Sequence, residues 1–220
     1  METMEKKEHY RRSLPHFQQP GQAYFVTWCL KDSVPSKALA RYTRELLLLN
    51  ARIESATKGR NTSAIVEQLQ SELYSTRRMY MTAFNDLLDT QTNPKVDLSK
   101  PENTKILIET LSFFEGKRLA NYAFCIMPNH VHWVFRLFDK DSTDRPVYLQ
   151  DIMQSVKRFS ANRINKTEGR TGPLWQKESF DTTIRNEKHL FAAIEYTLNN
   201  PVKARLVKNV EDWAGCRIFD

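Results

Sequence analysis

The sequence predicts an α+β protein built on a ferredoxin-like (RRM-like) split βαβ antiparallel sheet, with helices on one face, plus a helical insertion. Once residues 34–98 are set aside, strand-like and helix-like segments follow in the order β-α-β-β-α-β-α. The set-aside residues repeat apolar side chains at close to helical spacing, which indicates a helical hairpin or arm. We therefore predict one domain over residues 1–220, interrupted by a helical insertion at about 34–98.

The strand signal is found in three places. Residues 23–30 are rich in β-branched and aromatic side chains and are followed by polar residues. Residues 121–138 are typical of two short strands joined at Pro128-Asn129, a dipeptide common in turns. Residues 174–184 are expected to be extended. These segments supply the four strands that the fold class needs.

Helical periodicity predicts two helices in the insertion, at about 36–54 and 63–90, and three in the core. The first core helix begins at a capping box over residues 99–102, and Gly116 ends it. The last core helix begins at the cap Asn186 and ends at Pro201. The middle helix, at about 147–166, has a predicted buried stripe of Leu149, Ile152, Met153, Val156, Phe159 and Ile164.

The charge of the chain favours a polyanionic partner. Its net charge is +7 and its pI is near 9.3, which suits nucleic acid or an anionic membrane surface. No apolar run approaches the ~18 residues of a membrane span, and the first thirty residues are too polar for a signal peptide. The three cysteines are scattered, which is typical of reduced thiols in a cytoplasmic protein.

Two histidines begin the second strand of the 121–138 pair. Alternation along this strand sends Val131, Trp133, Phe135 and Leu137 to the core and places His130 and His132 together on the other face, which is predicted to be free. Two neighbouring imidazoles suit a shared metal ion or a phosphate. An isolated pair at this spacing is also common in strands that bind nothing.

The last helix places a tyrosine away from its predicted core stripe of Leu190, Phe191, Ile194 and Leu198. Tyr196 and Asn200 lie one turn apart, roughly opposite that stripe. Small residues one turn earlier leave room around the ring. On this helix alone, a tyrosine packed on a neighbouring loop is an equally good interpretation.

Four motifs follow one another in the chain: MPNHVHWVF, SVKRFSANRIN, GPLWQKESFD and IEYTLNNPVKARLV. Their order and spacing resemble the one-tyrosine HUH endonucleases, the transposase family of the smallest insertion sequences. Within that family the chain is most similar to the REP-associated tyrosine transposases of bacteria, and LPHFQQPGQAYFVTWCL matches as well. The resemblance covers about residues 9–33 and 103–213, whereas residues 34–98 depart from the usual course of the family.

The resemblance implies a chemistry for these positions. His130, His132 and Asn200 would bind a divalent ion, for which the family favours Mg²⁺ or Mn²⁺, although such a set could also take zinc in vitro. Tyr196 would attack a DNA phosphate and form a 5′-phosphotyrosine with a free 3′-OH. A phenol with a pKa of about 10 is a poor nucleophile at neutral pH, so a cation on the phosphate would assist it.

Basic residues gather in the second half of the chain. Residues 157–208 hold eleven Lys and Arg against five Asp and Glu, and so carry +6 of the net +7. This pattern is expected of a protein that contacts a phosphate backbone. Trp175 and Phe180 could stack on bases, but core packing is the commoner use of such residues. The candidate DNA-binding residues are Lys157, Arg158, Arg163, Arg170, Lys203 and Arg205.

The leading hypothesis is therefore a nucleoid-associated enzyme that nicks and rejoins single-stranded DNA, at hairpins of the REP type. The alternative is a non-catalytic protein, descended from such enzymes, that binds single-stranded or hairpin DNA. An RRM-like RNA binder is a third reading, although histidines stand where its base-stacking aromatics would be. Both a monomer and a homodimer are compatible with the sequence, with Tyr196 acting in its own subunit or across a dimer. Tyr122 and Tyr148 also lie near the predicted sheet.

Overall fold

The computed structural model describes residues 9–11, 15–17, 19–31, 33–35, 37–59, 63–90 and 94–219. The first eight residues of the charged N-terminal segment lie outside this part. In the described part, no helix is both long and apolar enough to cross a membrane. The elements are β1 (His9–Arg11), β2 (Pro15–Phe17), β3 (Ala23–Cys29), α1 (Ala40–Lys58), α2 (Ser63–Thr90), α3 (Pro101–Ser112), β4 (Leu119–Ile126), β5 (His130–Leu137), α4 (Leu149–Thr167), β6 (Phe180–Thr183), α5 (Glu187–Lys203), a 3₁₀ turn η1 (Val210–Asp212) and β7 (Cys216–Ile218).

The sheet has the topology that the sequence predicts. Its strands are ordered β6-β3-β5-β4-β7, and every neighbouring pair is antiparallel. Counting only the four predicted strands, the spatial order is fourth, first, third, second, which is the ferredoxin-like arrangement. The fold class is therefore confirmed. The C-terminal strand β7, which the sequence did not predict, extends the sheet beyond β4.

One face of the sheet forms the main core. Val131, Trp133, Phe135 and Leu137 all point into it, as their alternation predicts, and α3 and α4 cover them. The Trp133 indole donates a 2.6 Å hydrogen bond to the side chain of Asn121, which satisfies the one polar group of that ring. The histidines must then lie on the opposite face.

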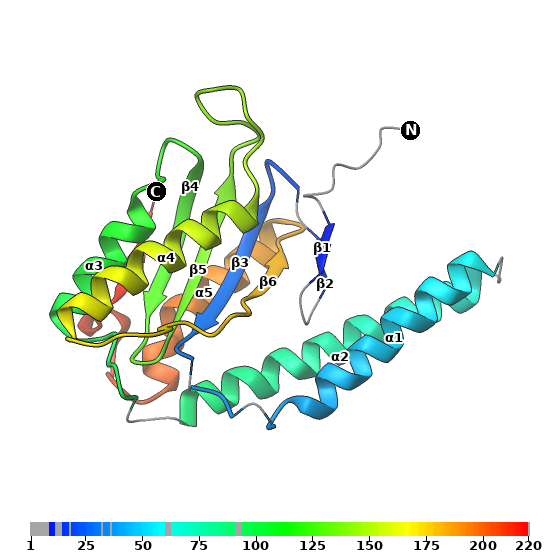
Figure 1. Ribbon diagram of the computed structural model, residues 1–220, viewed down its shortest axis with the longest axis horizontal. Coiled ribbons are helices and arrows are strands. Elements are labelled where there is room, and N and C mark those ends of the chain that lie inside the picture. The colour runs from blue at the N-terminus through cyan, green and yellow to red at the C-terminus, as the bar shows by residue number, and fades with distance from the viewer. Residues whose placement is uncertain are drawn as a thin grey trace.

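The opposite face is not free, which corrects the expectation of helices on one face only. Figure 1 shows α3 and α4 in front of the sheet and α5 behind it. Val134 of β5 packs against Ala193 and Ile184, with Leu190 and Ile194 beside them. Residues at both the start and the middle of α5 thus bury apolar surface on this face, which is why the helix lies there rather than in solvent.

Two side chains that periodicity assigned to cores are exposed. Phe159 on α4 is 49% exposed and Phe191 on α5 is 68% exposed. Each lies at the margin of an apolar stripe, and the residue facing the core beside it is Ser160 or Ala193. Helix α5 also continues through Pro201 to Lys203, because a proline in the last turn removes only one main-chain hydrogen bond.

The capping predictions had different outcomes. The Asn186 side chain accepts a 2.9 Å hydrogen bond from the His189 amide and caps α5 as predicted. Ser99 does not cap α3; its hydroxyl donates to Asp97, and Lys100 occupies the cap position. Pro101 in the first turn is still a good helix start, because its missing N–H would have no partner there.

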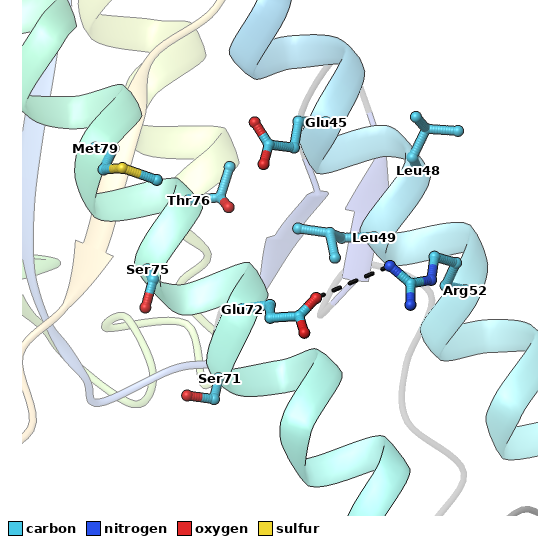
Figure 2. Close-up of a pocket in the computed structure, with 9 residues that line it drawn as sticks. All are labelled: Glu45, Leu48, Leu49, Arg52, Ser71, Glu72, Ser75, Thr76 and Met79. Atoms are coloured by element: carbon cyan, nitrogen blue, oxygen red, sulfur yellow. Dashed lines mark ion pairs between the residues drawn. The ribbon is translucent and has the colours of Figure 1, made fainter.

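The insertion forms a pair of helices, α1 and α2, that extends away from the sheet (Figure 1). Its outer part is held together by Leu49, Ala56 and Leu69, which contact one another. A groove of about 580 Å³ is lined by both helices. Figure 2 shows Arg52 and Glu72 facing each other across it, 3.9 Å apart, both too exposed for the pair to stabilise the arm much.

The inner part of the arm belongs to the body of the protein. Phe84 and Leu88 of α2 are each 1% exposed and share a hydrophobic cluster with Phe180 of β6 and Cys29 of β3. The Phe84 and Phe180 ring centroids are 4.1 Å apart. Burying a side chain of this size contributes about 1.5–3 kcal/mol, so the base of the arm is fixed to the sheet edge.

Candidate metal and tyrosine site

Strand β5 and helix α5 bring together the residues that the motifs singled out. His130 Nε2 and His132 Nε2 lie 3.1 Å apart, and Asn200 Nδ2 lies 3.0 Å from His132 Nε2. All three side chains are at most 1% exposed. Tyr196, one helical turn before Asn200, stands edge-on to the His132 ring, with the centroids 5.4 Å apart. The sequence-predicted set therefore converges on one point.

Each imidazole is oriented through its second nitrogen. His130 Nδ1 is 2.6 Å from Asn129 Oδ1, and His132 Nδ1 is 2.8 Å from Thr27 Oγ1. Thr27 lies directly opposite His132 in the β3–β5 register. Such hydrogen bonds on Nδ1 are the usual way in which proteins fix the ring of a metal-binding histidine and turn Nε2 toward the ion.

The protonation of His130 follows from its neighbours. Asn129 Nδ2 donates a 3.0 Å hydrogen bond to the Leu88 carbonyl, which can only accept, so Asn129 presents Oδ1 to His130. His130 Nδ1 must then carry the proton. Burial lowers the pKa of His130 to about 3, so the ring is neutral and its Nε2 holds a lone pair.

That lone pair faces His132 Nε2 at 3.1 Å, and two lone pairs repel at this distance. A cation between the rings removes the repulsion. A proton on His132 Nε2 also removes it, but only with the Asn200 amide turned so that its oxygen, and not its NH₂ group, faces this nitrogen. The Thr27 hydroxyl can donate or accept, so it supports either state of His132. Burial also holds the pKa of His132 well below its usual value, and neutral imidazoles are the form that binds metals.

Asn200 Oδ1 would be the third donor of a metal site here. Among the described residues this oxygen is buried without a hydrogen-bond partner, and an orphaned amide oxygen beside two imidazoles fits a divalent cation. No third His, Cys, Asp or Glu joins the two histidines in the described ranges, so an ion here would take an N,N,O set completed by DNA or water.

The Tyr196 hydroxyl is also buried, and within the part of the chain that the structure describes it has no hydrogen-bond partner. Its ring is edge-on to Phe25, with the centroids 5.8 Å apart, and Lys203 Nζ lies 5.8 Å from the centre of the ring. Burial raises the pKa of Tyr196, while the Lys203 charge opposes that rise. The phenol is therefore protonated at neutral pH.

Lys203 connects this site to the arm. Its ammonium is 2.9 Å from Asp89 and 4.0 Å from Asp86, both on α2. Among the six candidate DNA-binding residues, it is the one that contacts the tyrosine. Arg205 follows two residues later, exposed and with a positive φ of 58°.

The other four candidates lie on the α4 side of the sheet, away from the histidines. Lys157 donates to the carbonyls of residues 176–178, and Arg163 pairs with Glu109 at 2.6 Å. Arg158 is exposed, and Arg170 follows the end of α4. The concentration of charge along the sequence is thus divided between two faces in space.

Trp175 and Phe180 are core residues, in keeping with the commoner use of such side chains. Trp175 is 8% exposed, and its indole donates to the Ser160 hydroxyl. Phe180 packs between Tyr80 and Phe84 of the arm. Neither ring is open to a base.

The sequence analysis missed the residues that orient the imidazoles. Thr27 could have been found by extending the strand alternation to residues 23–30, which puts it on the face of the histidines. Asn129 was assigned only to the turn. The Leu88 carbonyl has no signal in the sequence, because a main-chain contact across 41 positions depends on how the arm folds back.

Comparisons with known proteins address the family. No family model matches the chain. It is 33% identical over 95 residues to a Haemophilus influenzae protein named "Putative REP-associated tyrosine transposase", a match that covers 41% of this chain and 54% of that protein. A second Haemophilus influenzae protein, named only as uncharacterized, is 29% identical over 105 residues, 41% of this chain and 57% of its own length. The chain spans about half the length of these curated relatives.

A solved structure described as a REP-associated tyrosine transposase bound to a REP hairpin aligns with a TM-score of 0.49 at 16% identity. It covers 94% of this chain and 80% of that one. At this level the alignment adds nothing to the fold already described. The curated relative at 33% identity does, and the resemblance of this chain to the REP-associated tyrosine transposases is confirmed.

Proposed function

We propose that the protein is a single-strand DNA endonuclease and transposase that nicks and rejoins DNA, at hairpins of the REP type, through a 5′-phosphotyrosine on Tyr196. The observation that carries the proposal is the convergence of Tyr196 and Asn200 with His130 and His132. Residues more than 60 positions apart in the chain, on β5 and α5, bring a phenol with no hydrogen-bond partner among the described residues beside an N,N,O donor set.

In this proposal Tyr196 Oη attacks the scissile phosphorus. The phenol gives up its proton to water as the Oη–P bond forms, the P–O3′ bond breaks, and the 3′ oxygen takes up a proton from water and leaves as a hydroxyl. His130, His132 and Asn200 would hold Mg²⁺ or Mn²⁺, and a bound ion supplies charge neutralisation at the phosphate and at the leaving oxygen. Lys203 contributes a positive charge beside the phenol, which favours the deprotonated nucleophile.

The phosphotyrosine retains the energy of the phosphodiester, so a 3′-OH from the same or another strand can reverse the step. Among the six basic candidates, Lys203 and Arg205 are the pair at the C-terminal end of α5, and we assign to them the phosphate on one side of the scissile one. The named relative supports a transposase of this kind.

The test is a covalent-adduct assay. Single-stranded oligonucleotides from the flanks of the protein's own gene, 5′- or 3′-labelled, are incubated with protein and Mn²⁺ or Mg²⁺. We expect a denaturation-resistant protein–DNA band carrying the 3′ portion of the strand, and none with Tyr196→Phe, which removes one oxygen and keeps the ring contacts. Tyr122→Phe and Tyr148→Phe are the matched controls and should keep the band.

If Tyr196→Phe still forms the adduct, another tyrosine must be the nucleophile. A wild-type protein that binds these strands tightly in Mn²⁺ without forming an adduct would instead support the alternative, a non-catalytic protein that binds single-stranded or hairpin DNA.

A further inference from the structure

A cleft of about 450 Å³ lies between the arm and the edge of the sheet, and Tyr196 is part of its lining. Phe25 of β3 and residues of β6 form the wall on the core side. The wall on the arm side comes from α2, including Tyr74, Arg77 and Arg78. The candidate nucleophile therefore adjoins a cleft that is made partly by the insertion.

The cleft is rich in positive charge. Arg77 and Arg78 of α2 and Arg185, just before α5, line it and are exposed. Across the described residues, no carboxylate pairs with any of these three guanidinium groups. Asp181 is the one carboxylate in the lining. Three arginines and one aspartate give the cleft a surplus of positive charge, which suits a phosphate backbone.

An aromatic ring accompanies these charges. Tyr74 is 60% exposed, and the Arg185 guanidinium lies 5.6 Å from the centre of its ring. Most large aromatics on a protein surface are better covered than this. A cationic groove with an open aromatic is the combination by which proteins hold unpaired nucleotides, since every base has a face that can stack.

We propose that this cleft binds the unpaired nucleotide next to the phosphate that Tyr196 attacks. Arg77, Arg78 and Arg185 take its phosphate, and its base packs on Tyr74. The position of the scissile phosphate rests on the proposed function. The volume is within the roughly 300–1,000 Å³ of small-ligand sites, which admits one nucleotide and excludes a duplex. The insertion thereby becomes part of the substrate site.

The experiment compares two DNA probes. One is a fluorescein-labelled hairpin from the flank of the gene with single-stranded tails on both sides, and the other is the same hairpin with the tails trimmed. For Arg77→Ala/Arg78→Ala we expect on the order of tenfold weaker binding to the tailed probe and unchanged binding to the trimmed one, by fluorescence anisotropy. The slope of log affinity against log salt should fall by about 0.7 for each lost phosphate contact.

The matched control is Arg41→Ala/Arg44→Ala, which removes the same charge from exposed positions of the same arm, outside the cleft lining. It should bind both probes as the wild type does. Tyr74→Ala should weaken binding to the tailed probe, and Tyr74→Phe should restore it, because the ring rather than the hydroxyl is needed.

Equal binding of the tailed probe by wild type and Arg77→Ala/Arg78→Ala, or an equal loss in the control, would overturn the proposal. The adduct assay separates the two claims. If the wild type forms an adduct and Arg77→Ala/Arg78→Ala binds the tailed probe as tightly as the wild type, the cleft proposal is wrong and the nicking function stands. Lost tail binding with no wild-type adduct supports the cleft as a single-strand site in a protein that does not nick.

Discussion

Asn129, in the turn before β5, donates a 3.0 Å hydrogen bond to the main-chain carbonyl of Leu88 in the last turns of α2. Both side chains are buried. The contact fixes which way the Asn129 amide faces, and through it the tautomer of His130. The arm therefore reaches the candidate metal site without supplying any of its candidate donors.

Asn129→Ala tests this connection. It removes the hydrogen bonds that Asn129 makes with the Leu88 carbonyl and with His130 Nδ1, so the ring can turn or change tautomer. We expect the affinity for Mn²⁺, measured by titration calorimetry, to fall about 10–100-fold. The control is Ser33→Ala, which removes a different hydrogen bond to the same turn, to the Asn129 carbonyl. Ser33→Ala should lower the stability of the fold somewhat and leave the Mn²⁺ affinity unchanged. An equal loss of Mn²⁺ affinity in both variants would mean that Asn129 acts only by stabilising the turn.

Metal binding should be visible without any DNA. A ligand at 100 times its Kd stabilises a fold by about 2.7 kcal/mol, so saturating Mn²⁺ should raise Tm by roughly 5–10 °C for a chain of this size. His130→Ala and His132→Ala should abolish the shift, and EDTA should reverse it. His189→Ala, at a half-buried histidine outside the donor set, should keep it. A full shift in the His130→Ala/His132→Ala double variant would place the ion elsewhere.

Asn200→Ala and Tyr196→Phe should have different effects on nicking. Two histidines can still hold an ion when water replaces the amide, so Asn200→Ala should retain weak nicking. Tyr196→Phe should be at background, because it lacks the attacking oxygen. Adduct yield over time on one oligonucleotide gives the order: wild type, then Asn200→Ala, then Tyr196→Phe. The reverse order would mean that Asn200 matters more than the phenol.

Replacing the buried Phe84 and the exposed Phe191 should lower the stability of the fold by very different amounts. Phe84→Ala empties a site that is 1% exposed and should cost about 3–5 kcal/mol, lowering Tm by roughly 6–20 °C. Phe191→Ala, at a ring that is 68% exposed, should change stability by about 0.5 kcal/mol or less. Thermal unfolding followed by circular dichroism measures both. Similar losses would mean that Phe191 is covered in solution.

The extent of the arm that the core requires can be measured by shortening it. Replacing residues 53–71 with a tight loop removes the outer cluster around Ala56 and Leu69, whose described members all belong to the arm. We expect a folded protein with its Mn²⁺ shift intact. Removing residues 40–90 entirely also uncovers Phe180 and Cys29 and should destabilise the sheet edge. Equal stability of the two deletions would make the whole insertion dispensable.

The sequence was sufficient for the four strands of the ferredoxin-like arrangement, although not for β7, because each of those four segments carries a local signal in composition or alternation. Val131, Trp133 and Phe135 could be assigned to the core from period two alone, and the order of the segments then left one familiar topology. The convergence of Tyr196 with the histidines followed from motif resemblance. In each case the signal was local, or was carried by a motif whose spacing is already known.

What could not be predicted depends on contacts between distant segments. Whether a helix covers the second face depends on how α5 packs after its last loop, and Phe191 cannot be distinguished from Leu190 on a helical wheel. The division of the basic residues between two faces has the same origin. Lys157 and Lys203 belong to one charged stretch of sequence, but they end on opposite sides of the sheet.

The Leu88 carbonyl has a consequence for anyone who redesigns this protein. An insertion is normally treated as a module that can be exchanged, provided that its two ends are rejoined. Here the last turns of the inserted helix complete the hydrogen bonding of the turn that carries His130. A graft of residues 34–98 into a relative would need an asparagine at the position of Asn129, and a chimera without the arm would need another acceptor for that amide.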